Sequence, residues 1–240
     1  MPEDATIPRT TPAGGVALVV GAGGGIGHAL EHALRTRGDF HQVIGTRRDG
    51  ELPLDLTDEA SIAQAVAVAT THGELRLVID ATGFLHGAGF RPEKSLRELD
   101  AVHMAHAFAV NAIGPALLMK HVLPRLPRTG RAVFVTLSAR VGSIGDNRLG
   151  GWHAYRASKA ALNQLVRTAA VELARRAPSA VCVALHPGTV DTGLSAPFSR
   201  SGLVVHTPEA AAVHLLRVID CLQPADSGGF FDWRGEPVPW

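Results

Sequence analysis

Short runs of consecutive apolar residues alternate with helix-like segments along most of this chain, and that alternation restricts the folds open to it. Runs suited to strands occupy residues 16–20, 43–46, 75–80, 132–137, 181–185 and 229–232. Helices are expected at 26–37, 58–72, 101–122, 152–177 and 208–221. Because the strand runs are apolar throughout, both faces of their sheet must be covered. The sequence predicts an α/β fold, a Rossmann-type doubly wound parallel sheet flanked by helices, in a single domain.

The length, charge and cysteine content of the chain limit the classes of protein to which it can belong. The 240 residues fit one domain, expected at 15–240, after a flexible polar arm at 1–14 that lacks the apolar core of a signal peptide. A formal net charge of +1 gives no electrostatic case for nucleic acid, and no apolar run approaches the roughly 20 residues of a membrane span. Cys182 and Cys221 lie in apolar contexts, which predicts two buried thiols and a cytoplasmic protein.

A glycine-rich turn follows the first strand and opens the first helix. Gly21, Gly25 and Gly27 have the spacing G-x-x-x-G-x-G. Glycine permits a tight turn and a close approach of the backbone to a pyrophosphate, and the helix N-terminus offers free N–H groups to phosphate. The spacing alone is also compatible with a turn that binds nothing. Its place between strand and helix favours a dinucleotide site.

The end of the second strand indicates which dinucleotide. A carboxylate there would accept hydrogen bonds from the ribose 2′-hydroxyl of NAD, but this chain has Arg47 and Arg48. Arginine suits the 2′-phosphate of NADP through forked, charge-assisted hydrogen bonds. We therefore predict NADP(H) as the preferred cofactor and NAD(H) as the second choice. The alternative is two solvated surface arginines.

Tyr155 and Lys159 carry the clearest chemical signal. Four residues apart on the predicted helix 152–177, they project from one face. A phenol normally titrates near pH ~10, and a neighbouring cation favours the phenolate and lowers that pKa. The pair is therefore suited to proton transfer near neutral pH. Tyr155 is the single tyrosine of the chain, so it has no rival phenol.

With these features in place, the chain resembles the short-chain dehydrogenase/reductase family over about residues 16–235. The resemblance implies that Asn111, Ser138, Tyr155 and Lys159 are catalytic: Ser138 would donate to the substrate oxygen, Lys159 would hold the nicotinamide ribose, and Asn111 would anchor a water. It also implies cofactor contacts from Gly21, Gly25, Ile26, Gly27, Arg47, Asp55, Leu56, Gly83, Tyr155, Lys159, Pro187, Gly188, Val190 and Thr192. Residues 185–192, 195–198 and 230–240 further resemble a subgroup related to the bacterial C-factor signalling protein.

One segment departs from the family pattern. Where the family has Asn-Asn-Ala-Gly after its central strand, this chain has Asp80-Ala81-Thr82-Gly83. Gly83 preserves the close backbone approach to the cofactor. The asparagine that braces the strands is replaced, and Thr82 or Asp80 is expected to substitute for it.

These features predict an NADP(H)-dependent oxidoreductase that reduces a small-molecule ketone or aldehyde, or oxidises the matching alcohol. The alternative is a cofactor-binding regulatory or signalling protein of C-factor type whose redox turnover is incidental. A homo-oligomer is expected, because the helices at 101–122 and 152–177 carry small residues that allow close packing between subunits, and the family resemblance implies a homodimer or homotetramer. Core packing is the other interpretation of those alanines, which are Ala154, Ala157, Ala160, Ala161, Ala169 and Ala170.

The remaining candidates are histidines and aromatic residues. Two pairs at helical spacing, His28 with His32 and His103 with His106, could face a metal, but neither has a third ligand at a suggestive spacing. We therefore predict no metal and assign these histidines to the surface or to packing. Trp152, His186 and Phe198 could line a substrate pocket or belong to the core or an interface.

Overall fold

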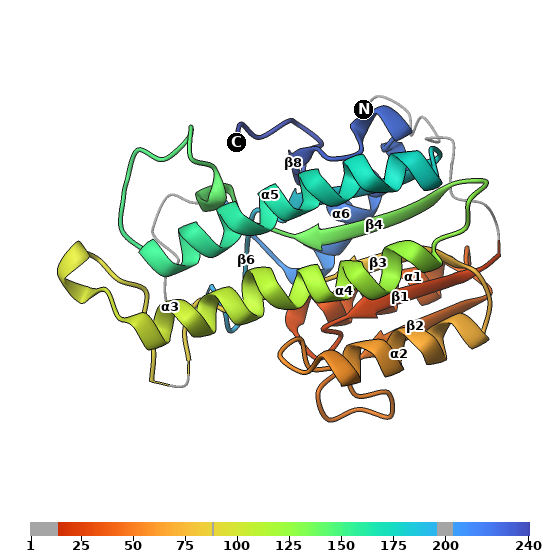
Figure 1. Ribbon diagram of the computed structural model, residues 1–240, viewed down its shortest axis with the longest axis horizontal. Coiled ribbons are helices and arrows are strands. Elements are labelled where there is room, and N and C mark those ends of the chain that lie inside the picture. Colours follow the sequence, from red (N-terminus) through yellow and green to blue (C-terminus); the bar gives the residue numbers. More distant parts are fainter. Residues whose placement is uncertain (1–13, 88, 196–203) are drawn as a thin grey trace.

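The computed structural model describes residues 14–87, 89–195 and 204–240, and its centre is a parallel six-stranded sheet (Figure 1). The strand order is β2-β1-β3-β4-β5-β8. The strands are β1 (Val16–Val20), β2 (Gln42–Thr46), β3 (Leu75–Asp80), β4 (Ala132–Leu137), β5 (Ala180–His186) and β8 (Phe230–Asp232). This confirms the predicted doubly wound sheet. The expected N-terminal arm, except for Gly14, lies outside the described residues.

The described residues form six α-helices, and local sequence signals set their ends. They are α1 (Gly25–Arg37), α2 (Glu59–Thr71), α3 (Ala101–Phe108), α4 (Gly114–Val122), α5 (His153–Arg176) and α6 (Pro208–Cys221). Asp58 caps α2 by accepting a hydrogen bond from the Ala60 amide, and Thr207 caps α6 through the Ala210 amide. Gly38 ends α1 in the left-handed region, at φ 66°.

Two hydrophobic cores, one on each face of the sheet, explain the continuous apolar runs. Val16, Leu18 and Val20 point to the face covered by α2, α4 and α5. Ala17 and Val19 point to the opposite face, where α1 and α6 pack. Successive strand residues alternate between faces, so a strand buried on both sides must be apolar at every position.

The helix expected at 101–122 is interrupted in a specific way. Residues Ala109–Ile113 form one π-helical turn between α3 and α4, and the rod otherwise continues from Ala101 to Arg125. By length and composition alone this rod could cross a membrane, although polar residues such as His103 and Asn111 interrupt its apolar run. Leu118 and Val122 of this helical rod are fully buried in the core beside the sheet, as expected for a core helix of a globular domain.

The connections place the chemistry at one edge of the sheet. From β1 the chain passes to β2 on one side and then to β3 on the other, so a crevice forms at the carboxyl ends of β1 and β3. Two short strands that were not predicted, β6 (Thr189–Val190) and β7 (Val205–His206), pair in parallel after β5. Cys182 of β5 is buried as expected, but Cys221 is exposed at the end of α6, and both thiols are free.

Candidate active site

The glycine turn between β1 and α1 forms a tight cradle. Gly21 adopts φ 84°, a conformation that favours glycine. A Cβ on Gly27 would lie 2.7 Å from the Gly21 carbonyl carbon, so only glycine fits there. Gly24 caps α1 without a side-chain hydrogen bond, which leaves the first amides of the helix available to a ligand. A cradle that a side chain would fill, at the positive end of a helix, fits a dinucleotide pyrophosphate.

The segment after β2 brings positive charge to this turn. Arg47 lies against Gly23, and its guanidinium donates to a carboxylate oxygen of Glu31 at 3.0 Å. The other oxygen of Glu31 pairs with Arg35 at 2.7 Å. One buried carboxylate therefore orients two arginines, and the group retains net positive charge. Arg48, by contrast, is exposed.

Asp55 and Leu56 lie beyond this segment. Hydrogen bonds from the hydroxyl and amide of Thr57 hold the pKa of Asp55 below its usual value, and Arg48 adds to that effect. Leu56 is buried, and a side chain on Gly114 of α4 would collide with it. The loop that carries Asp55 is thereby fixed against the core.

Gly83, Asn111 and Lys159 converge at the centre of the site. A Cβ on Gly83 would lie 3.8 Å from both the Asn111 Oδ1 and the Lys159 Nζ. The three residues come from the loop after β3, from the π-turn and from α5. The structure thus joins three of the site residues predicted separately from sequence.

Asn111 connects two of these elements through hydrogen bonds. Its Oδ1 accepts from the Phe84 amide and its Nδ2 donates to the Phe84 carbonyl, both at 2.7 Å. The same Nδ2 donates to the Ser158 hydroxyl at 3.1 Å, and Ser158 donates to the carbonyl of Tyr155. Asn111 is fully buried in the π-turn, an irregularity that occurs frequently at functional sites.

Tyr155 and Lys159 lie one turn apart on α5, and burial dominates the acidity of both. Burial raises the pKa of Tyr155 above its ordinary value, the opposite of the direction expected from a neighbouring lysine. Burial also lowers the pKa of Lys159 to about 8, although Asp80 opposes this shift. Lys159 donates to the Leu137 carbonyl at 2.8 Å, which fixes its ammonium group at the end of β4.

Ser138 lies at the end of β4 and is held by the same helix. Its hydroxyl donates to the Asn163 Oδ1 at 2.7 Å, and both side chains are buried. Asn163 follows Tyr155 and Lys159 at a further interval of four residues, so one face of α5 carries all three. That spacing was visible in the sequence, yet Asn163 was not singled out.

Asp80 performs the bracing role for which the sequence offered two candidates. Its Oδ2 accepts from the Thr136 hydroxyl of β4 at 2.7 Å, and its Oδ1 accepts from the hydroxyl and amide of Thr82. Burial raises the pKa of this carboxyl, whereas the hydrogen bonds from Thr82 and Thr136 and the charge of Lys159 oppose the rise. Asp80 therefore ties β3 to β4 directly beneath the site.

The segment after β5 closes against the glycine turn. A Cβ on Gly25 would lie 2.9 Å from the Thr192 Cγ2, so these two predicted cofactor residues are in contact. Gly188 adopts φ 81° and packs against Trp233 and His206. Val190 is buried within β6, and Pro187 and Ile26 are half-buried. Phe198 lies outside the described residues.

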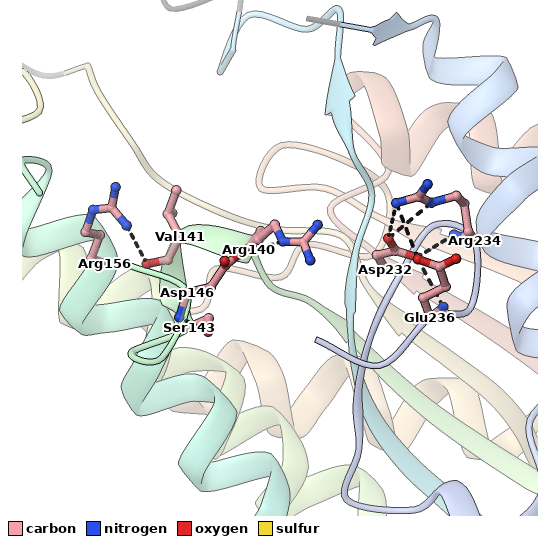
Figure 2. Close-up of polar contacts among 8 residues, drawn as sticks. All are labelled: Arg140, Val141, Ser143, Asp146, Arg156, Asp232, Arg234 and Glu236. Atoms are coloured by element: carbon pink, nitrogen blue, oxygen red, sulfur yellow. Dashed lines mark hydrogen bonds and ion pairs between the residues drawn. The ribbon is translucent and has the colours of Figure 1, made fainter. Parts of the chain in front are cut away.

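Arginine side chains make polar contacts in the segments that follow β4 and β8 (Figure 2). After β4, Arg140 donates to Asp146 at 2.7 Å, and Arg156 donates to the Val141 carbonyl. After β8, Arg234 pairs with Asp232 and Glu236.

Two aromatic candidates differ in their placement. Trp152 packs edge-on against Tyr155, with ring centroids 6.3 Å apart, so it flanks the site. His186 lies at the end of β5, where burial and then Arg140 lower its pKa to about 4, while Asp232 opposes them.

The histidine pairs do not assemble a metal site within the described part of the chain, where no group of three His, Cys, Asp or Glu side chains could hold an ion. His28 and His32 are exposed. His103 is buried, with Nδ1 3.2 Å from a carboxylate oxygen of Glu93. Sequence reasoning missed Glu93, because no motif marks it.

This chain is similar to known proteins in both sequence and structure. The family model described as enoyl-(acyl carrier protein) reductase matches residues 29–217. The C-signal of Myxococcus xanthus is 39% identical over 61% of this chain and 84% of its own. A 1-hydroxy-2-glutathionyl-2-methyl-3-butene dehydrogenase of Rhodococcus sp. (strain AD45) is 33% identical over 93% of this chain and 98% of its own. The solved structure of NADPH-bound carbonyl reductase from chicken fatty liver superimposes with a TM-score of 0.81 and 28% identity, covering 97% and 100% of the two chains.

Proposed function

This chain belongs to the short-chain dehydrogenase/reductase family and is an oxidoreductase, and we propose that it uses NADP(H) to reduce a ketone or aldehyde or to oxidise the matching alcohol. The convergence of Gly83, Asn111 and Lys159, one helical turn from Tyr155, carries this proposal. A protein that only binds a dinucleotide needs no such group of proton donors and acceptors.

The proposed roles follow from where charge develops. A bound nicotinamide supplies or accepts the hydride. Reduction of a carbonyl places negative charge on its oxygen, and a nearby hydroxyl must stabilise that charge and release a proton. Tyr155 is the proton donor, and its raised pKa keeps the phenol protonated at neutral pH, as an acid requires. Ser138 is the second hydroxyl donor, and Asn163 fixes its orientation.

Lys159 and Asn111 support this transfer. Lys159, held by the Leu137 carbonyl, presents a cation whose pKa near 8 allows it to exchange a proton close to neutrality. Asn111 fixes the loop after β3 through Phe84 and reaches the Tyr155 carbonyl by way of Ser158. These hydrogen bonds hold the turn that carries Tyr155 in place relative to Gly83.

The test is turnover of a carbonyl panel by the parent and by Tyr155→Phe. The variant loses one hydroxyl, so NADPH binding should be retained while kcat falls by about 10²–10⁴-fold. Binding is measured by fluorescence titration in the same preparations. If Tyr155→Phe has the same kcat as the parent on a substrate that the parent turns over, Tyr155 is not the proton donor.

The NADP(H) preference rests on Arg47. Its contact with the glycine turn and its orientation by Glu31 support a role in holding a 2′-phosphate. NADPH should bind more tightly than NADH, and Arg47→Asp should abolish the difference. Arg48→Asp compares the exposed neighbouring arginine, and loss of the preference in that variant but not in Arg47→Asp would move the role to Arg48. Equal affinities for the two cofactors in the parent would contradict this assignment.

A second candidate function is a cofactor-binding signalling protein with incidental turnover. The 39% identity with the C-signal favours it. The carbonyl panel separates the two functions, because a signalling protein would bind NADPH without efficient turnover of any substrate.

Assembly and location are proposals as well. An apolar groove between α4 and α5, lined by Ala116, Met119, Leu165 and Ala169 among others, supports a homodimer or homotetramer. Ala154 and Ala170, named as interface candidates from sequence, are buried in the core. Light scattering giving the 25.2 kDa mass of one chain would exclude the oligomer. Two free thiols suit a reducing compartment such as the cytoplasm.

A further inference from the structure

The catalytic helix α5 begins in an unusual way. Its N-cap is Trp152, which adopts a left-handed conformation at φ 52° and ψ 43° and whose side chain does not cap the helix. It is the only non-glycine residue with positive φ among those the structure describes. A helix start normally relies on Ser, Thr, Asp or Asn to satisfy its first amides. Another residue must hold the turn that carries Tyr155.

Glu93 supplies both missing contacts from a distant loop. Its backbone carbonyl accepts from the Trp152 amide at 2.5 Å, and its Oε2 accepts from the Ala154 amide at 3.2 Å. Glu93 is 2% exposed, so its carboxylate lies in the protein interior at the positive end of α5. These contacts bridge about 60 residues of sequence and replace the N-cap that Trp152 cannot provide.

The loop that carries Glu93 is itself anchored near the site. The other carboxylate oxygen, Oε1, lies 3.2 Å from the His103 Nδ1. The His103 ring stacks on Phe90, with centroids 4.9 Å apart and planes 7° from parallel. Phe84, near the start of this loop, is held by Asn111. The loop is thus fixed at one end by a predicted catalytic residue and along its length by α3.

We propose that Glu93 is a positioning residue that sets the start of α5 and thereby places Tyr155 for proton transfer. The expected effect on catalysis rests on the proposed function, whereas the role of Glu93 at the start of α5 does not depend on it. Lys159, one turn further on, has its own anchor in the Leu137 carbonyl. Loss of Glu93 should therefore disturb Tyr155 while leaving the cofactor contact of Lys159 in place.

The experiment compares Glu93→Ala, Glu93→Gln and a control in the same loop. Glu93→Gln keeps an oxygen that can accept from Ala154. The control, Glu98→Ala, removes an exposed carboxylate that accepts from the Lys94 amide at 2.8 Å within the same segment. Amide hydrogen exchange at residues 152–155 and NADPH affinity are measured for all variants, and kcat is measured with a carbonyl turned over by the parent.

Glu93→Ala should speed exchange at the start of α5 and lower kcat about tenfold, with NADPH affinity unchanged within about twofold. Glu93→Gln should stay within about threefold of the parent in kcat, and Glu98→Ala should match the parent throughout. If the amides at the start of α5 exchange in Glu93→Ala at the same rate as in the parent, the proposal is overturned, whatever the kcat of the variant. Faster exchange with parental kcat would overturn the link to Tyr155. A parent that turns over no carbonyl would count against the proposed function, and the exchange measurement would still decide the role of Glu93 in α5.

Discussion

The hydrogen bond from Thr136 to Asp80 offers a sharp test of how this sheet is braced beneath its active site. Both side chains are fully buried, and the Thr136 hydroxyl lies 2.7 Å from the Asp80 Oδ2. Thr136→Val keeps the shape of the side chain and removes the donor. Water cannot replace it without opening the core, so the lost bond is not compensated by solvent.

The magnitude follows from the charge of the acceptor. A hydrogen bond to a charged group contributes about 1.5–3 kcal/mol, against about 0.5–1.5 kcal/mol for a neutral pair. For a chain of this length, each kcal/mol shifts Tm by about 2–4 °C, so Thr136→Val should lower Tm by about 3–12 °C where Asp80 is ionised and by about 1–6 °C where it is protonated. The pKa of Asp80, already raised by burial, rises further when Thr136 no longer opposes that shift.

The effect should therefore depend on pH. A carboxyl whose folded pKa is raised contributes stability that is present below its unfolded pKa and is lost as pH rises through the folded pKa. The variant has the higher folded pKa, so it loses more stability over that rise than the parent does. The stability difference between the two proteins should be larger at pH 8 than at pH 4.

Thr46→Val is the matched control. Thr46 ends β2, is also fully buried, and its hydroxyl has no hydrogen-bond partner among the described residues. The same substitution there removes an unpaired polar atom and should be neutral or stabilising by up to about 1 kcal/mol. Urea denaturation at both pH values measures the two variants. Equal destabilisation by Thr136→Val and Thr46→Val would refute the argument that Asp80 and Thr136 brace the sheet.

Three further predictions address the site and the thiols. Gly27→Ala should lower NADPH affinity at least tenfold in a fluorescence titration, because its Cβ would displace the Gly21 backbone, whereas Gly24→Ala makes only a 3.5 Å contact and should bind normally. Burial lowers the folded pKa of Lys159 to about 8 from an ordinary value of 10.5, so the cost of burying its charge falls as pH rises between these values. Lys159→Met should therefore stabilise the protein against urea at pH 7 and much less at pH 10. A stabilisation that does not change with pH would contradict this prediction. A thiol reagent should modify Cys221 in the native protein and reach Cys182, whose pKa burial raises to about 12, only after denaturation; rapid modification of both would show that Cys182 is not enclosed.

The sequence by itself determined the architecture of this protein. Runs such as Val16–Val20 are apolar at every position because each residue must face one of two cores, and this pattern identifies a covered parallel sheet without any coordinates. Glycine at positions 21 and 27 likewise reports a local steric demand, since the turn has no room for a side chain. Such signals are short-range, so they survive in the linear sequence.

Tertiary structure alone decided the contacts between distant segments. Nothing near Trp152 in the sequence shows that Glu93 satisfies the amides of its helix, because the two residues meet only when the loop after β3 folds over α5. The exposure of Cys221 and the burial of Tyr155 follow from packing in the same way. Burial reversed the direction of the Tyr155 pKa shift expected from Lys159, since a charge brought out of water costs free energy that sequence spacing does not reveal.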